Sequence, residues 1–178
     1  VEIAESGDRL SIYNEISGTA MSIGEVGGGS TATELGVQSL NESTSLSSFN
    51  DGAGVDIITG AVDPVTGLPD PAADMDLRVT LADGRSFEVD LVGAQSVGDV
   101  LATMRAAATA AGIGVPAEFD AGLVANGNGI ALSDGTAGAG ELVVEGINNS
   151  PAADQLGIEG SGSAMIAGKD RAKISVDG

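Results

Sequence analysis

The sequence predicts an α+β fold that is rich in strands, with antiparallel hairpins, one main helix in each complete module, and two small lobes. Three observations lead to this prediction. Short apolar segments alternate with polar residues, which is the pattern of half-buried strands. The 28 glycines among 178 residues indicate many tight turns between such strands. One longer segment, residues 96–111, instead carries apolar residues at helical spacing.

Composition and charge exclude several classes of function. The chain has 26 acidic and 7 basic residues, and its formal net charge of −19 repels nucleic acid and anionic membrane surfaces. It contains neither His nor Cys, so Ser–His relays, thiolate nucleophiles, the usual zinc sites and disulfides are excluded. No apolar run approaches the ~20 residues that span a bilayer. We therefore expect no catalytic residue, no cofactor, no enzymatic activity, and neither a nucleic-acid nor a membrane partner.

Outside the main helix, alternation and turn residues predict short strands and small helices. In the first half of the chain we expect a hairpin over 9–26, a short helix over 33–35 ended by Gly36, an extended linker over 38–48, a strand over 55–62 and a loop over 63–71. In the second half we expect strands near 115–119, 130–132 and 142–144, a helix over 151–156 ended by Gly157, and extended structure over 165–176. Glycine ends helices and proline interrupts strands, which places these boundaries.

A hairpin and the main helix lie between these two sets. Asp83-Gly84 predicts a type I′ turn between the hairpin strands. Ser96, followed three residues later by Asp99, predicts a helix N-cap with a capping box. The helix is expected to bury its apolar stripe against the hairpin. The residues involved are Val97, Val100, Leu101 and Met104 on the helix, and Leu77, Val79, Phe87, Val89 and Leu91 on the hairpin.

Part of the sequence repeats, with an offset of 120 residues from Leu10 to Ile130 and 121 from Leu35 to Leu156. The matched positions are apolar, glycine and helix-cap residues, so the repeat preserves a folding pattern. The matched segments are Leu10–Ile12 with Ile130–Leu132, Met21–Ile23 with Leu142–Val144, and Ala32–Val37 with Ala153–Ile158. The sequence therefore predicts the back half of a first module over 1–44 and a complete module over 45–160. A C-terminal extended segment over 161–178 either completes the first module or opens a third.

The ordered segments resemble a known family. They read SVGDVLATMRAAATAAGIGVPAEF (96–119), GNGIALSDGTAGAGELVVEG (127–146) and AADQLGIEG (152–160). This order resembles the flagellin hook IN motif, in which a Ser/Thr-led helix with an Ala-rich end precedes a strand and a Gly-led hairpin. The segments IGEVGGGSTATELGV (23–37) and STSLSSFNDGAGV (43–55) are similar to linkers between tandem copies of that motif.

The resemblance implies a structural, surface-exposed part of the bacterial flagellum, extracellular and secreted through the flagellar export apparatus. The implied partners are other flagellar axial proteins, namely hook-associated proteins and flagellin, contacted through long terminal helices that these 178 residues lack. Without those helices we expect a monomer. Because the motif occurs in junction proteins, flagellins and filament cap proteins, the particular family member stays open.

A second class of function is an extracellular adhesin or calcium-dependent binding module. Residues 52–58 fit the G-x-G-x-D-x-U pattern of calcium-binding β-helix repeats, and Asp51 and Asp56 are the candidate ligands. Such sites need stacked copies, since each calcium lies between neighbouring turns, and the chain has one copy. A turn that leads into a strand is the simpler interpretation.

Overall fold

The computed structural model describes residues 2–3, 10–12, 21–35, 37–124, 129–162 and 165–167. Its elements, in chain order, are β1 (Glu2–Ile3), β2 (Leu10–Ser11), α1 (Thr31–Glu34), the short 3₁₀ turns η1 (Leu46–Ser48) and η2 (Asn50–Gly52), β3 (Leu77–Thr80), β4 (Ser86–Val89), α2 (Val97–Ala110), β5 (Phe119–Leu123), β6 (Ile130–Asp134), β7 (Leu142–Gly146), α3 (Ala152–Gln155), β8 (Gly160–Gly162) and β9 (Met165–Ala167). The strand pairs are antiparallel and one helix is long, which confirms the α+β prediction.

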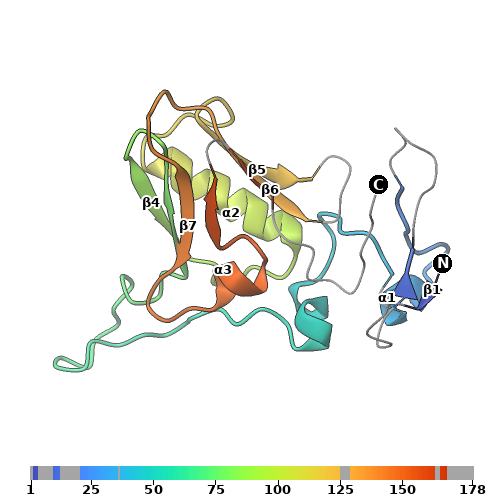
Figure 1. Ribbon diagram of the computed structural model, residues 1–178. Coiled ribbons are helices and arrows are strands. Elements are labelled where there is room, and N and C mark those ends of the chain that lie inside the picture. The colour runs from blue at the N-terminus through green and yellow to red at the C-terminus, as the bar shows by residue number, and fades with distance from the viewer. Residues whose placement is uncertain are drawn as a thin grey trace.

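Two sheets and helix α2 form the large lobe, residues 40–167 (Figure 1). One sheet has the order β4-β3-β7-β8 and the other β5-β6-β9. Helix α2 packs against β4 of the first sheet and β5 of the second, so one core joins all three elements. The rings of Phe87 and Phe119 meet edge to face across the two sheets, with centroids 5.0 Å apart. All nine residues predicted for the helix–hairpin contact are buried.

Helix α2 begins as its sequence predicts. The Ser96 hydroxyl accepts from the backbone N–H of Asp99, and the Asp99 carboxylate accepts from the backbone N–H of Ser96, which is a capping box. The segment predicted as an extended linker supplies two further partners. The N–H groups of Val97 and Gly98 donate to the carbonyls of Thr44 and Glu42. The linker is therefore docked across the helix start, where the first N–H groups lack partners within the helix.

The expected strand over 55–62 is wrong. The backbone N–H groups of Ile58 and Ala61 donate to the carboxylates of Asp76 and Asp74, so side chains take the place of a neighbouring strand. Beyond this segment, an isolated bridge between Val62 and Pro69 closes the predicted loop.

Two other local predictions need correction. Gly84 has a φ of +87°, but Asp83 is not among the residues with positive φ, so the β3–β4 turn is not type I′. The turn is instead a three-residue loop in which Gly84 takes the left-handed position. The strand expected near 115–119 starts only at Phe119, because residues 115–118 form a turn that contains Pro116.

The small lobe consists of the described residues up to 39 and lies beside the large lobe in Figure 1. Strand β2 pairs with β1, with Leu10 opposite Ile3. The expected hairpin over 9–26 is therefore wrong in its first strand, because that strand pairs with the earlier strand β1. The middle of the expected hairpin lies outside the described residues. Helix α1 forms where a short helix was expected.

The described residues of the C-terminal segment join the large lobe. Strand β8 pairs with β7, and β9 pairs with β6. The described residues 160–162 and 165–167 therefore pair within the large lobe. Residues 168–178 lie outside the described part of the chain, as do residues 13–20.

Candidate functional site

The two candidate calcium ligands are not brought together in a described site. Asp56 is engaged with Gln155: its carboxylate accepts from Gln155 Nε2 at 2.8 Å, and its backbone N–H donates to Gln155 Oε1 at 2.6 Å. The side chain of Asp51 lies outside the described residues. Asn50, a possible further ligand, donates through Nδ2 to the carbonyl of Gly54. Among the described residues, no group of three or more acidic side chains is placed to hold a metal ion.

Asp76 is fully buried and has a structural role. One carboxylate oxygen accepts from the N–H of Ile58 and from the hydroxyl of Ser150, and the other accepts from the N–H of Leu91. A buried carboxylate is stable only when it is hydrogen-bonded in this way. It therefore joins the segment before β3, the end of the β4 region and the loop before α3.

Four other carboxyl groups serve turns and the helix cap. Backbone N–H donors at Gln95 and Ser96, with the Ser96 hydroxyl, lower the pKa of Asp99. Arg85 lowers the pKa of Glu118 through a side-chain hydrogen bond. Backbone N–H groups lower the pKa of Asp63 and of Asp83 in the same manner. Each hydrogen bond favours the ionised form of the carboxyl group. These four carboxylates therefore stabilise local turns and the helix start.

Each basic side chain of the described residues is paired with carboxylates. Arg78 contacts Glu88 and Glu145 on the strands that flank it, Arg85 contacts Asp83 and Glu118, and Arg105 contacts Asp120. The pairs of Arg78 and Arg85 are exposed and that of Arg105 is half-buried, so each retains contact with solvent and contributes little to stability.

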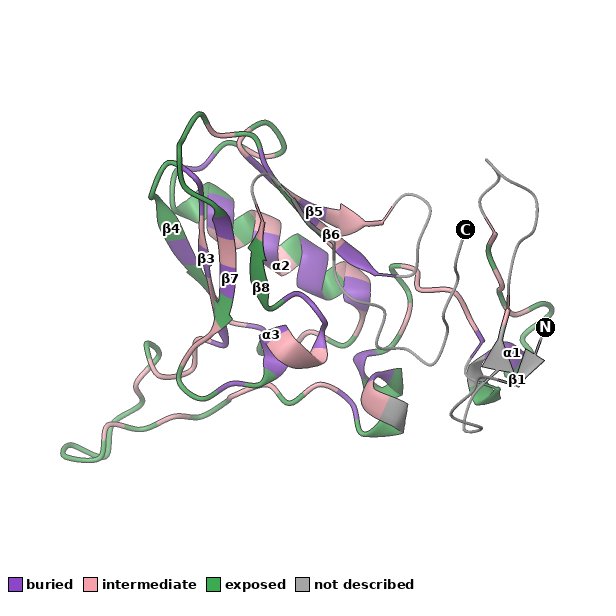
Figure 2. Ribbon diagram, viewed as in Figure 1, coloured by how far each residue is buried: buried purple, intermediate pink, exposed green. Residues whose placement is uncertain are grey.

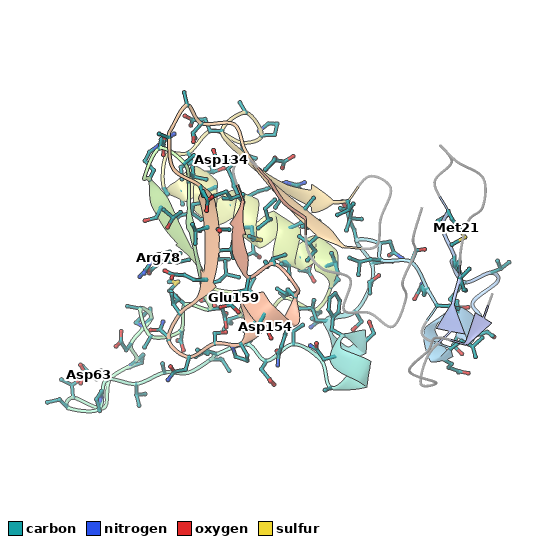
Figure 3. All side chains as sticks on the ribbon, viewed as in Figure 1. Met21, Asp63, Arg78, Asp134, Asp154 and Glu159 are labelled. Atoms are coloured by element: carbon teal, nitrogen blue, oxygen red, sulfur yellow. The ribbon has the colours of Figure 1, made fainter. Side chains whose placement is uncertain are left out.

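A long loop projects from the large lobe between η2 and β3, with Asp63 at its far end (Figure 3). Two backbone hydrogen bonds close its tip: the Asp63 N–H donates to the Leu68 carbonyl, and the Gly67 N–H donates to the Asp63 carbonyl. The Asp63 carboxylate also accepts from the N–H groups of Val65 and Thr66. Val65 and Leu68 are 91% and 64% exposed there. The tip thus presents apolar side chains on an ordered turn.

The small lobe repeats the large lobe at the level of strand register. The pairs Ile3–Leu10 and Glu2–Ser11 of β1–β2 correspond, 120 residues on, to the pairs Leu123–Ile130 and Gly122–Ala131 of β5–β6. The β1–β2 hairpin is thus the β5–β6 hairpin of another module. Sequence reasoning matched β2 with β6 but missed β1, because two residues carry no periodicity.

The helix ends repeat as well. In the small lobe the N–H groups of Val37 and Gln38 both donate to the Ala32 carbonyl. In the large lobe the N–H groups of Ile158 and Glu159 both donate to the Ala153 carbonyl, at the equivalent positions. The pairing beyond the helix also recurs, because the Ser39 N–H donates to Ile23, whose counterpart Val144 pairs with Gly160. The predicted repeat is therefore a structural repeat.

The four core positions of the small lobe recur within the larger core of the other lobe, where buried residues line the sheets and α2 (Figure 2). Ala32 and Val37, with Ile12 and Ile23 packed against them, make the small core. Their counterparts Leu132, Val144, Ala153 and Ile158 are almost completely buried. Leu35 shows the difference most clearly: it is 55% exposed, whereas its counterpart Leu156 is 4% exposed.

Comparison with known proteins adds no assignment. Neither a family model, nor a curated protein, nor a solved structure matches this chain. Within the described ranges, no helix is both long and apolar enough to cross a bilayer. Within the described residues, the feature that bears on function is the recurrence of strand register and helix-end hydrogen bonds between the two lobes.

Proposed function

We propose that this chain is a structural, non-enzymatic, surface-exposed domain of the bacterial flagellum, from the central region of a hook–filament junction protein similar to flagellar hook-associated protein 3. The observation that carries the proposal is the structural repeat, because tandem modules of this order are what the resemblance to the flagellin hook IN motif implies. Repeat modules present surface along an assembly and contact mainly their neighbours in the chain.

The physical character of the chain supports a passive, exposed role. Its net charge of −19 keeps a crowded surface soluble through mutual repulsion. Buried Asp76 holds three segments of the fold together, and the arginines of the described residues are paired with carboxylates. The domain acts sterically, on the outside of a ring of subunits, while assembly with other axial proteins belongs to helices outside these residues. These 178 residues by themselves form a monomer, so their sedimentation coefficient does not change with concentration.

Immunogold electron microscopy of intact cells, with antibody raised against this fragment, tests the proposal. We expect a narrow band of gold where hook meets filament. Label along the filament or at its tip would instead indicate the central domain of a flagellin or filament cap protein. Label spread over the cell body would contradict the flagellar proposal and favour an adhesin.

The alternative, a calcium-dependent extracellular binding module, rests on the sequence pattern at residues 52–58 and makes its own prediction. A calcium-dependent module melts at a higher temperature in millimolar calcium than in chelator, because a ligand that binds only the folded state stabilises it. Since Asp56 is already held by Gln155, we expect the two melting temperatures to be equal.

A further inference from the structure

In the large lobe, other elements cover the strands and the helix end that recur in the small lobe. There, β7 lies between β3 and β8, with Val144 opposite Val79 on one side and Gly160 on the other. Helix α2 packs against the same core. The covering elements, β3, β4 and α2, come from residues 77–110, which form a β-hairpin followed by an amphipathic helix.

The small lobe retains one of these two pairings at Ile23, the residue equivalent to Val144. Ile23 pairs with Ser39, as Val144 pairs with Gly160. In the part of the chain that the structure describes, nothing takes the position of β3 beside Ile23, and nothing takes the position of α2 over the small core. Met21, labelled in Figure 3, is only partly buried, whereas its counterpart Leu142 is fully buried.

We infer that the small lobe is an acceptor surface for a β-hairpin and amphipathic helix with the pattern of residues 77–110, supplied by the same polypeptide ahead of the β1–β2 hairpin. The large lobe gives the reason for this source. There, the hairpin and helix come just before β5, joined to it by residues 111–118 alone, and β5 is the counterpart of β1. A core of four apolar residues makes a two-stranded hairpin and one turn of helix only marginally stable by itself. The inference does not depend on the flagellar proposal.

The test uses the full chain with its own covering element added. Residues 40–120 are fused directly ahead of Val1, which restores the order of elements found in the large lobe. Amide hydrogen exchange is then measured at Val37 and Gln38, whose N–H groups bond to Ala32. We expect exchange to slow by about tenfold or more, because covering a core raises the free energy of local opening. Ile158 and Glu159, the equivalent amides of the large lobe, are the internal reference and stay unchanged.

Two variants of the fusion distinguish docking of the added hairpin and helix from a general slowing of exchange caused by the longer chain. Val100→Asp in the added copy alone places a charge in the buried stripe of its helix, so the slowing is expected to disappear. Leu35→Asp in the acceptor is expected to abolish the slowing as well, although the same change in the unfused chain alters little because Leu35 is exposed.

Exchange at Val37 and Gln38 that is as fast in the fusion as in the unfused chain would overturn the inference. A second result would also overturn the inference: slow exchange of the same amides in the unfused chain, seen only at concentrations where the chain dimerises. That result would assign the surface to a second copy of the chain.

Discussion

Leu35 and Leu156 occupy the same position in two copies of one structural unit, yet the first is 55% exposed and the second 4%. The strand registers and helix-end hydrogen bonds of the two copies agree, so the difference is not in the backbone. In the large lobe, residues 77–110 contribute to the core that contains Leu156, whereas no described segment takes their place in the small lobe. The comparison shows that local sequence is sufficient to specify the path of the chain, whereas burial depends on elements far away in the sequence.

The largest loss of stability is expected from Val100→Asp in the large lobe of the unmodified chain. Val100 is fully buried in the large lobe, and an unpaired charge there should cost about 4 kcal/mol or more, enough to unfold that lobe. Ala102→Asp, on the exposed side of α2, is the matched control and should cost less than about 1 kcal/mol. Thermal unfolding followed by circular dichroism distinguishes them. If the Val100 variant melted like the parent, the packing of α2 described above would be wrong.

The pair Leu156→Ala and Leu35→Ala compares the two copies directly. Truncation of the buried leucine is expected to cost about 3 kcal/mol, because it removes apolar contacts and leaves a cavity. Truncation of the exposed leucine should cost under about 0.5 kcal/mol. Urea unfolding of the two variants measures both values. Equal destabilisation would mean that Leu35 is covered as well as Leu156 is, which contradicts the comparison.

A smaller effect is expected where two backbones approach in the large lobe. A Cβ at Gly138 would collide with the carbonyl group of Ala82, so Gly138→Ala should destabilise by about 2 kcal/mol. Gly24→Ala in the small lobe is the control, because nothing lies within 4 Å of its added Cβ. A Gly138 variant as stable as the Gly24 variant would show that the loop before β7 moves away from Ala82 freely.

The smallest effect concerns the pH dependence of the α2 cap. The folded-state pKa of Asp99 is lowered, so its contribution to stability is present above the unfolded value of about 3.9 and is lost as pH falls through the folded value. Asp99→Asn is therefore expected to destabilise the chain at neutral pH, with a difference that shrinks as the pH drops below about 4. Urea unfolding at a series of pH values measures this. A difference that does not change with pH would contradict an ionised cap.

Local signals predicted some elements well. The start of α2 follows from Ser96 and Asp99, and its buried stripe follows from helical spacing, because both depend on residues a few positions apart. The fold class and the repeat followed from similar short-range patterns.

Other features depend on distant partners, and the sequence pattern did not contain them. Residues 55–62 look like a strand, but Asp74 and Asp76 accept hydrogen bonds from Ile58 and Ala61 and replace the neighbouring strand. Asp76 itself is fully buried among three segments. For the candidate calcium site, Asp56 fits the pattern, but Gln155, 99 residues away, occupies its carboxylate.

The most direct test of the comparison is native-state hydrogen exchange in the unmodified chain, read at two equivalent pairs of amides. Val37 and Gln38 bond to Ala32 as Ile158 and Glu159 bond to Ala153. If the small lobe is the uncovered copy of the same unit, all four amides are protected, and the first pair exchanges at least about tenfold faster than the second. Equal protection of the two pairs would contradict the account, because it would show that the small lobe is as well covered as the large one.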